Sequence, residues 1–153
     1  CPDCWFVVVM PSVGISTPEA FKRYDIMGSP VHPDCERQEQ AIRENDLAAM
    51  CTAAGNALEH CRKENTSENS LRAHSSQIVS ICKQLNAQGA VTSLMTGSGA
   101  AVFGVFDDGQ KAKQAQQALQ AGYDQVYLAR PVRGGARVLP RPAKKDHTPR
   151  REK

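Results

Sequence analysis

The segment best suited to chemistry is a glycine-rich stretch at residues 95–100 (MTGSGA). Gly97 and Gly99 lie two residues apart, and glycine tolerates positive φ angles and close approach of the backbone to a ligand. Consecutive backbone N–H groups in such a turn can form a concavity that binds an anion. Ser98 could donate a hydrogen bond to a phosphate or cap the turn. The segment has neither Walker nor dinucleotide-binding spacing, so the residues alone leave an anion site and a plain turn between strands both open.

The six cysteines offer a second kind of chemistry. Cys1 and Cys4 have the spacing of half a zinc site, but tetrahedral zinc needs four ligands and no second pair follows. Buried cysteine packs as a small hydrophobe. We therefore predict core packing, and no metal or redox role, for the four that are scattered along the chain: Cys35, Cys51, Cys61 and Cys82. The sequence predicts no metal-ligand set and no catalytic residue.

The positive charge of the chain is concentrated at one end. The formal net charge is +3, yet residues 131–153 contain eight basic and two acidic residues, so residues 1–130 carry a net charge of −3. The terminal segment is rich in Pro, Arg and Lys and contains no aromatic side chain that could stack on a base. We predict a globular domain over residues 1–130, a disordered basic tail over 131–153, and no nucleic-acid partner.

The overall composition is that of an ordinary globular protein, with 41% hydrophobic and 23% charged residues. The longest strongly apolar run, residues 5–10, is too short to cross a membrane, and we expect no secretory signal. We expect a cytoplasmic protein with free thiols and no membrane partner. Because Cys1 stands almost inside a strand-like run, we also expect the sequence to be a piece of a longer protein.

Four short apolar runs predict the strands that position the glycine stretch. Residues 4–11 (CWFVVVMP) are β-branched and aromatic, which is typical of a central strand. Three further strands are predicted at residues 90–95, 100–106 and 125–129. The order strand, helices, strand pair, helix, strand predicts an α+β domain, with a mostly antiparallel four-stranded sheet backed by helices.

Apolar residues at helical spacing predict the helices, at residues 17–24, 34–44, 46–61, 71–89 and 109–122. Thr17 and Asp34 are the predicted N-caps of the first two. The helix at 46–61 carries one apolar stripe, made of Leu47, Met50, Cys51, Ala54, Leu58 and Cys61. The last helix should turn four residues inward: Ala112, Ala115, Ala118 and Leu119.

Several motifs follow the order typical of one enzyme superfamily. Residues 89–106, which contain the glycine stretch, resemble the third conserved motif of the GHMP kinases. Within that superfamily, the strand, proline and ST-P-x-x-F pattern at residues 5–21 resembles the 4-diphosphocytidyl-2-C-methyl-D-erythritol kinase family. Three shorter matches agree in order, at residues 32–34 (HPD), 44–47 (ENDL) and 55–59 (GNALE). Together these motifs span residues 4–129.

The resemblance implies a two-domain kinase that transfers the γ-phosphoryl of ATP, with Mg²⁺, to a hydroxyl of a cytidyl-linked methylerythritol in isoprenoid precursor biosynthesis. This chain would be the C-terminal domain, which completes the substrate pocket. The position of Phe21 would lie at the cytosine end, and an aromatic face suits a flat pyrimidine, although Phe21 could also be a core aromatic. Thr17 and Pro18 would line the same wall. The phosphate side would be formed by Thr96, Gly97, Ser98 and Gly99.

The residues that perform the chemistry in this superfamily have no counterpart in the chain. Its phosphate loop, catalytic Asp and Lys belong to the N-terminal domain. We therefore expect the chain alone to bind neither ATP nor Mg²⁺, to be inactive alone, and to share its small-molecule substrate with the missing domain. Two alternatives stay open: the C-terminal domain of a homoserine or mevalonate kinase type, and a free-standing binding module without catalysis.

Overall fold

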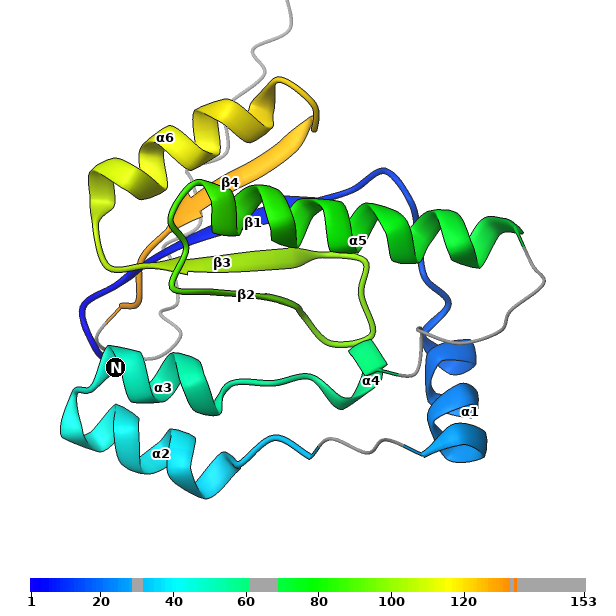
Figure 1. Cartoon of the computed structure of the whole chain (residues 1–153), viewed down its shortest axis with the longest axis horizontal. Coiled ribbons are helices and arrows are strands. Elements are labelled where there is room, and N and C mark those ends of the chain that lie inside the picture. Colours follow the sequence, from blue (N-terminus) through cyan, green and yellow to red (C-terminus); the bar gives the residue numbers. More distant parts are fainter. Residues whose placement is uncertain (29–31, 61–68, 133, 135–153) are drawn as a thin grey trace, which may run out of the picture.

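The computed structural model describes residues 1–28, 32–60, 69–132 and 134. The predicted tail lies almost wholly outside these residues, as does Cys61. Ten elements follow one another along the chain (Figure 1): β1 (Trp5–Met10), α1 (Thr17–Met27), α2 (Cys35–Glu44), α3 (Leu47–Ala53), α4 (Ala57–His60), α5 (Asn69–Ala87), β2 (Thr92–Met95), β3 (Val102–Phe106), α6 (Gly109–Gln120) and β4 (Gln125–Ala129).

The four strands form one sheet in the order β2-β3-β1-β4, and every pairing is antiparallel. The predicted α+β fold is thus confirmed, and β1 is a central strand as its apolar run indicated. Val8 of β1 stands between Phe103 on β3 and Tyr127 on β4. Strands β2 and β3 are joined by residues 96–101, so the glycine loop connects two adjacent strands at one end of the sheet.

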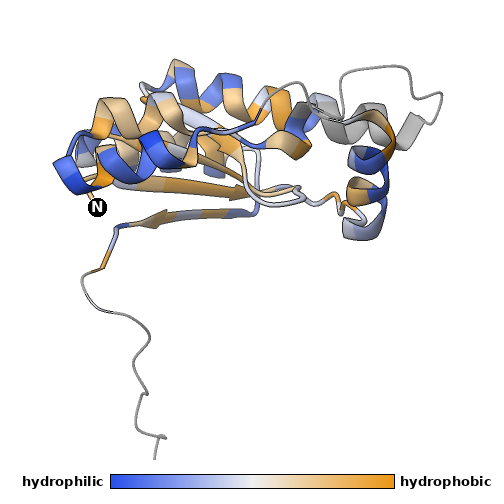
Figure 2. Ribbon diagram, turned by 90° about the horizontal axis from the view of Figure 1, so that it is seen from below, coloured by the Kyte–Doolittle hydropathy of each residue, from blue (hydrophilic) through white to orange (hydrophobic). Residues whose placement is uncertain are grey.

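Helices α5 and α6 cover one face of the sheet (Figure 1). Alternate residues of β1, Val7 and Val9, are fully buried against them, because successive strand side chains point to opposite faces. The helices contribute the buried residues Ile78, Ile81 and Leu85 from α5 and Ala112, Ala115 and Leu119 from α6. Ala118 is exposed, contrary to prediction. In Figure 2 the strands carry mainly hydrophobic colours, as this core requires.

A second, smaller core uses the other face of β1 and β3. Phe6 and Phe103 pack their rings 6.0 Å apart beside residues of α2 and α3. Cys4 and Cys51 are buried in this core, and burial raises the pKa of both thiols above the ordinary value. Core packing is thus confirmed for Cys51, and Cys82 lies half-buried against the larger core. Cys35 is exposed, so the prediction was wrong for that residue.

Two expectations about the helices were also wrong. The N-cap of α1 is Ser16, and Thr17 is already helical. The stretch expected to form one helix over residues 46–61 is divided into α3 and α4, because the chain becomes extended at Ala54.

Three aspartates cap the helices α2, α3 and α6. The carboxylates of Asp34, Asp46 and Asp108 each accept hydrogen bonds from backbone N–H groups of the first helical turn.

Helix α1 stands apart from the sheet at one end of the molecule in both ribbon views (Figures 1 and 2). It contains no buried residue. Phe21 is 51% exposed, and Ile26 and Met27 are also exposed, so the helix presents apolar side chains to solvent. A helix is usually stabilised by packing one apolar face, and α1 lacks that cover within the described part of the chain.

Candidate functional site

The glycine loop is a closed turn between β2 and β3. Two hydrogen bonds close it, from Thr96 N–H to the Ala101 carbonyl (2.9 Å) and from Gly99 N–H to the Thr96 carbonyl (3.0 Å). Gly97 has φ 56° and Gly99 has φ 88°. Both angles lie in the left-handed region, which glycine adopts without the steric cost that a Cβ imposes. The turn therefore requires the two glycines for its backbone alone, whatever it binds.

Asn56 holds this loop from outside. The Asn56 side-chain amide donates to the Met95 carbonyl (2.8 Å) and to the Gly97 carbonyl (2.9 Å). Its Oδ1 accepts from the Leu58 N–H (3.0 Å) at the start of α4. Asn56 lies in the break between α3 and α4, so this break places the amide against the loop. The helix predicted over residues 46–61 runs through Gly55 and Asn56. A glycine followed by a capping residue inside an apolar stripe is, however, a signal for a helix break.

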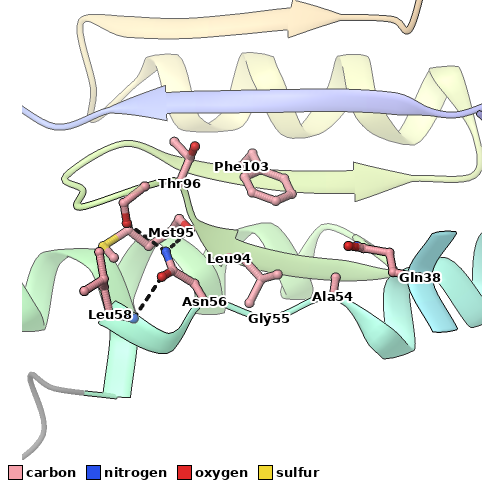
Figure 3. A pocket seen from close by; sticks show the side chains of 10 residues that line it. Gln38, Ala54, Gly55, Asn56, Leu58, Leu94, Met95, Thr96 and Phe103 are labelled. Atoms are coloured by element: carbon pink, nitrogen blue, oxygen red, sulfur yellow. Dashed lines mark hydrogen bonds between the residues drawn. The ribbon is translucent and has the colours of Figure 1, made fainter. Parts of the chain in front are cut away.

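A pocket of about 410 Å³ opens beside this contact (Figure 3). It lies between α2, the α3–α4 break, the sheet and the glycine loop, and none of its lining residues is charged. The lining residues are Gln38, Ala54, Gly55, Asn56, Leu58, Leu94, Met95, Thr96, Gly97 and Phe103. Of the residues predicted for the site, only Thr96 and Gly97 line this pocket.

The other predicted residues meet the loop through α1. The Thr17 hydroxyl lies 2.8 Å from the Ser98 hydroxyl, across 81 residues of sequence, and either oxygen can be the donor. The structure thus brings the first turn of α1 directly against the glycine loop. Pro18 is exposed on the same turn. Phe21 is exposed one turn further along, so it is not the core aromatic that sequence reasoning allowed as an alternative.

We predict that the Thr17 and Ser98 hydroxyls stabilise the fold jointly. Thr17→Val, Ser98→Ala and the double variant should show a coupling of about 0.5–1.5 kcal/mol in the free energy of unfolding, the usual net value of one hydrogen bond. Denaturant titration of the four proteins measures it. Thr52→Val is a matched control, because the Thr52 hydroxyl bonds only within α3 and should show no coupling to Ser98→Ala. Additive effects of Thr17→Val and Ser98→Ala, within about 0.3 kcal/mol, would contradict the contact.

The lining of the pocket beside the loop contains no charged residue. Among the residues that the structure describes, no group of three or more His, Cys, Asp or Glu side chains could hold a metal ion. None of the helices in the described ranges has the length and apolarity that a membrane crossing requires. The ion pair Arg43–Glu39 lies on an exposed helix face, where such pairs contribute little, whereas in the pair Arg23–Glu19 the arginine is half-buried. The site offers backbone groups, hydroxyls, an amide and exposed apolar surface.

The fold and the loop define a known class. Residues 39–125 match the family described as GHMP kinases C terminal, so the chain belongs to this family. Among curated proteins it is similar to the 4-diphosphocytidyl-2-C-methyl-D-erythritol kinase of Bacillus pumilus (strain SAFR-032), at 33% identity over 131 residues. It is similar to the same kinase of Listeria monocytogenes serovar 1/2a, at 32% over 130 residues. These alignments cover 86% and 85% of this chain but 42% and 41% of the relatives.

Solved structures share the fold. A 4-(cytidine 5'-diphospho)-2C-methyl-D-erythritol kinase matches with a TM-score of 0.56 at 20% identity, covering 84% of this chain and 43% of that chain. The L. major mevalonate kinase in complex with R-mevalonate matches with a TM-score of 0.57 at 14% identity, with the same coverage. Because both identities are low, these likenesses establish the architecture alone. The chain spans about two fifths of the length of the curated relatives it matches.

Proposed function

We propose that this chain is the substrate-side domain of an ATP-dependent kinase that phosphorylates 4-diphosphocytidyl-2-C-methyl-D-erythritol, a step toward isoprenoid precursors. The observation that carries the proposal is the 2.8 Å contact between Thr17 and Ser98. Thr17 belongs to the proposed cytidyl wall and Ser98 to the proposed phosphate-side loop, so their contact supports a substrate that carries both a base and a diphosphate. The curated relatives that carry this kinase name support the same substrate.

Each part of the proposed site suits one part of that substrate. The exposed ring of Phe21 offers a flat apolar face for a pyrimidine, while Thr17 and Pro18 belong to the same helix end. The glycine loop offers backbone N–H groups and the Ser98 hydroxyl, which are the donors that phosphate oxygens accept. The substrate would then lie along α1 toward the loop, with its reactive hydroxyl directed to a second domain.

The residues present do not fit the ATP-bound metal. Magnesium prefers carboxylate and water oxygens, and residues 95–100 and the pocket beside them contain no Asp or Glu. In the proposed enzyme, ATP, Mg²⁺ and the groups that act on the γ-phosphoryl belong to the second domain, and this chain binds and orients the acceptor.

We predict that the 153-residue chain alone does not transfer phosphate from ATP to this substrate. Phosphoryl transfer depends on positioning and charge neutralisation, and in the described part of the chain neither residues 95–100 nor the pocket beside them contains a charged side chain that could neutralise the γ-phosphoryl. Joining the chain to the part of the Bacillus pumilus relative that it does not span should restore transfer, measured with radiolabelled ATP. Turnover by the purified chain alone would contradict the prediction. A folded joined protein that phosphorylates homoserine or mevalonate, but not the cytidyl substrate, would contradict the proposed substrate.

A further inference from the structure

The Asn56 side chain makes three hydrogen bonds, although Asn56 lies in a short connection between two helices. Both N–H bonds of its amide point at carbonyl oxygens, those of Met95 and Gly97, while its oxygen accepts the Leu58 N–H. An Asn side chain supplies two donors and an acceptor in one plane. Aspartate has the same shape without the donors, and serine lacks the reach. The chemistry of this contact therefore specifies an amide.

The contact acts on the orientation of the loop rather than on its closure. Two backbone hydrogen bonds already close the turn, from Thr96 and from Gly99, and neither uses the carbonyls that Asn56 holds. A trans peptide keeps its C=O and N–H on opposite sides. When Asn56 holds the Gly97 carbonyl, the N–H of Ser98 is therefore directed away from Asn56. The amide thus fixes one peptide plane in the middle of the loop.

We propose that Asn56 is a positioning residue, which sets the orientation of the peptide between Gly97 and Ser98 and thereby the face that the loop presents to an anionic ligand. The effect on the loop stands on the contacts of this chain, whereas the identity of the ligand rests on the proposed function. The α3–α4 break is then a functional feature, because an uninterrupted helix would carry residue 56 without the turn that brings it to the loop.

The sharpest test is Asn56→Asp in the 153-residue chain. The carboxylate keeps the acceptor for the Leu58 N–H but turns an anionic oxygen toward two carbonyl oxygens. The electrostatic repulsion between these oxygens should move the loop away from residue 56. Asn86→Asp is the matched control, because Asn86 is exposed at the end of α5 and undergoes the same change of charge. Asn56→Ala, which removes the whole contact without adding charge, is the second variant. Amide spectra, amide hydrogen exchange and melting are measured for each protein.

In Asn56→Asp we expect the amide resonances of Thr96, Gly97 and Ser98 to move, while those of the core strands stay in place. Exchange of the Thr96 and Gly99 amides should quicken about tenfold, the factor that one hydrogen bond's stabilisation represents. Asn86→Asp should change neither. Unmoved loop resonances in both Asn56 variants would overturn the proposal. Loss of the whole fold in both would overturn it as well, since a positioning role leaves the core intact.

Titration with cytidine 5′-diphosphate separates this inference from the proposed function. The wild-type chain and Asn86→Asp should bind this probe alike, and Asn56→Asp should bind it about tenfold more weakly, the loss expected when one hydrogen bond to the phosphates is misplaced. If the wild-type chain does not bind the probe, the proposed function fails while the loop resonances still decide the role of Asn56. If Asn56→Asp binds like wild type although its loop has moved, the positioning role is refuted.

Discussion

Gly109→Ala is expected to lower the free energy of unfolding by about 1–3 kcal/mol, the usual cost of overpacking. An ideal Cβ on Gly109 would lie 2.7 Å from Cε2 and 2.8 Å from Cζ2 of the Trp5 indole. The ring has little room to retreat, because the guanidinium carbon of Arg130 lies 4.5 Å from the ring centroid and Trp5 packs on the main core. Alanine is the better helix former, so a net loss would report the clash.

Gly122→Ala provides the control for this measurement. A Cβ on Gly122, which follows the same helix, would have no atom within 4 Å. We expect a change within about 0.5 kcal/mol, as for other surface substitutions. Denaturant unfolding, followed by circular dichroism, compares the two variants. Equal stability of Gly109→Ala and Gly122→Ala would contradict the close contact between Trp5 and the start of α6.

Valine at Gly97 or Gly99 is expected to abolish most of the turnover of the joined two-domain enzyme. Both glycines have positive φ. In this region the backbone conformation of an L-residue is destabilised by roughly 1–2 kcal/mol, and that of a β-branched residue by more. The loop should therefore abandon the conformation that Asn56 and Thr17 hold. By contrast, Ser98→Ala removes hydrogen bonds without backbone strain, and we expect up to about a tenfold loss of rate.

Gly97→Asn separates backbone strain from bulk. A Cβ at Gly97 would have no atom within 4 Å, and asparagine tolerates the left-handed region better than other residues. This variant should keep the melting temperature closer to wild type than Gly97→Val does, and kinetics measured beside melting distinguish the causes. Valine variants that melt normally and turn over at the wild-type rate would remove the loop from the site. If activity falls only in proportion to the fraction of folded protein, the two glycines are needed for the fold and not for a role in the active site.

The order of the elements follows from local patterns in the sequence. Residues 4–11 are apolar without alternation because β1 is paired on both edges and packed on both faces. Asp34 is followed by a helix because its carboxylate satisfies a backbone N–H that the first turn leaves unpaired. Such signals are local, so they can be recognised in the sequence without knowledge of the tertiary contacts.

The parts that were missed depend on tertiary contacts or on fine geometry. The stripe at residues 47–61 has helical spacing, and the hydrogen bonds that Asn56 makes 39 and 41 residues away favour the break. Ala118 is next to the buried Leu119 but about 100° around the helix from it, so it faces solvent. The contact of Thr17 with Ser98 joins two segments that no periodicity relates. The resemblance proposed both segments for one site, and only the structure brings them together.

We propose above all that α1 and the glycine loop form one binding surface for a cytidyl diphosphate. Titration of the isotopically labelled 153-residue chain with cytidine 5′-diphosphate, followed by amide spectra, tests it most directly. We expect that amides around Phe21 and amides of residues 96–99 shift together on one saturation curve, and that Phe21→Leu weakens binding without altering the melting temperature. Shifts in the loop alone, shifts confined to other surfaces, or no saturable shift at all would contradict it.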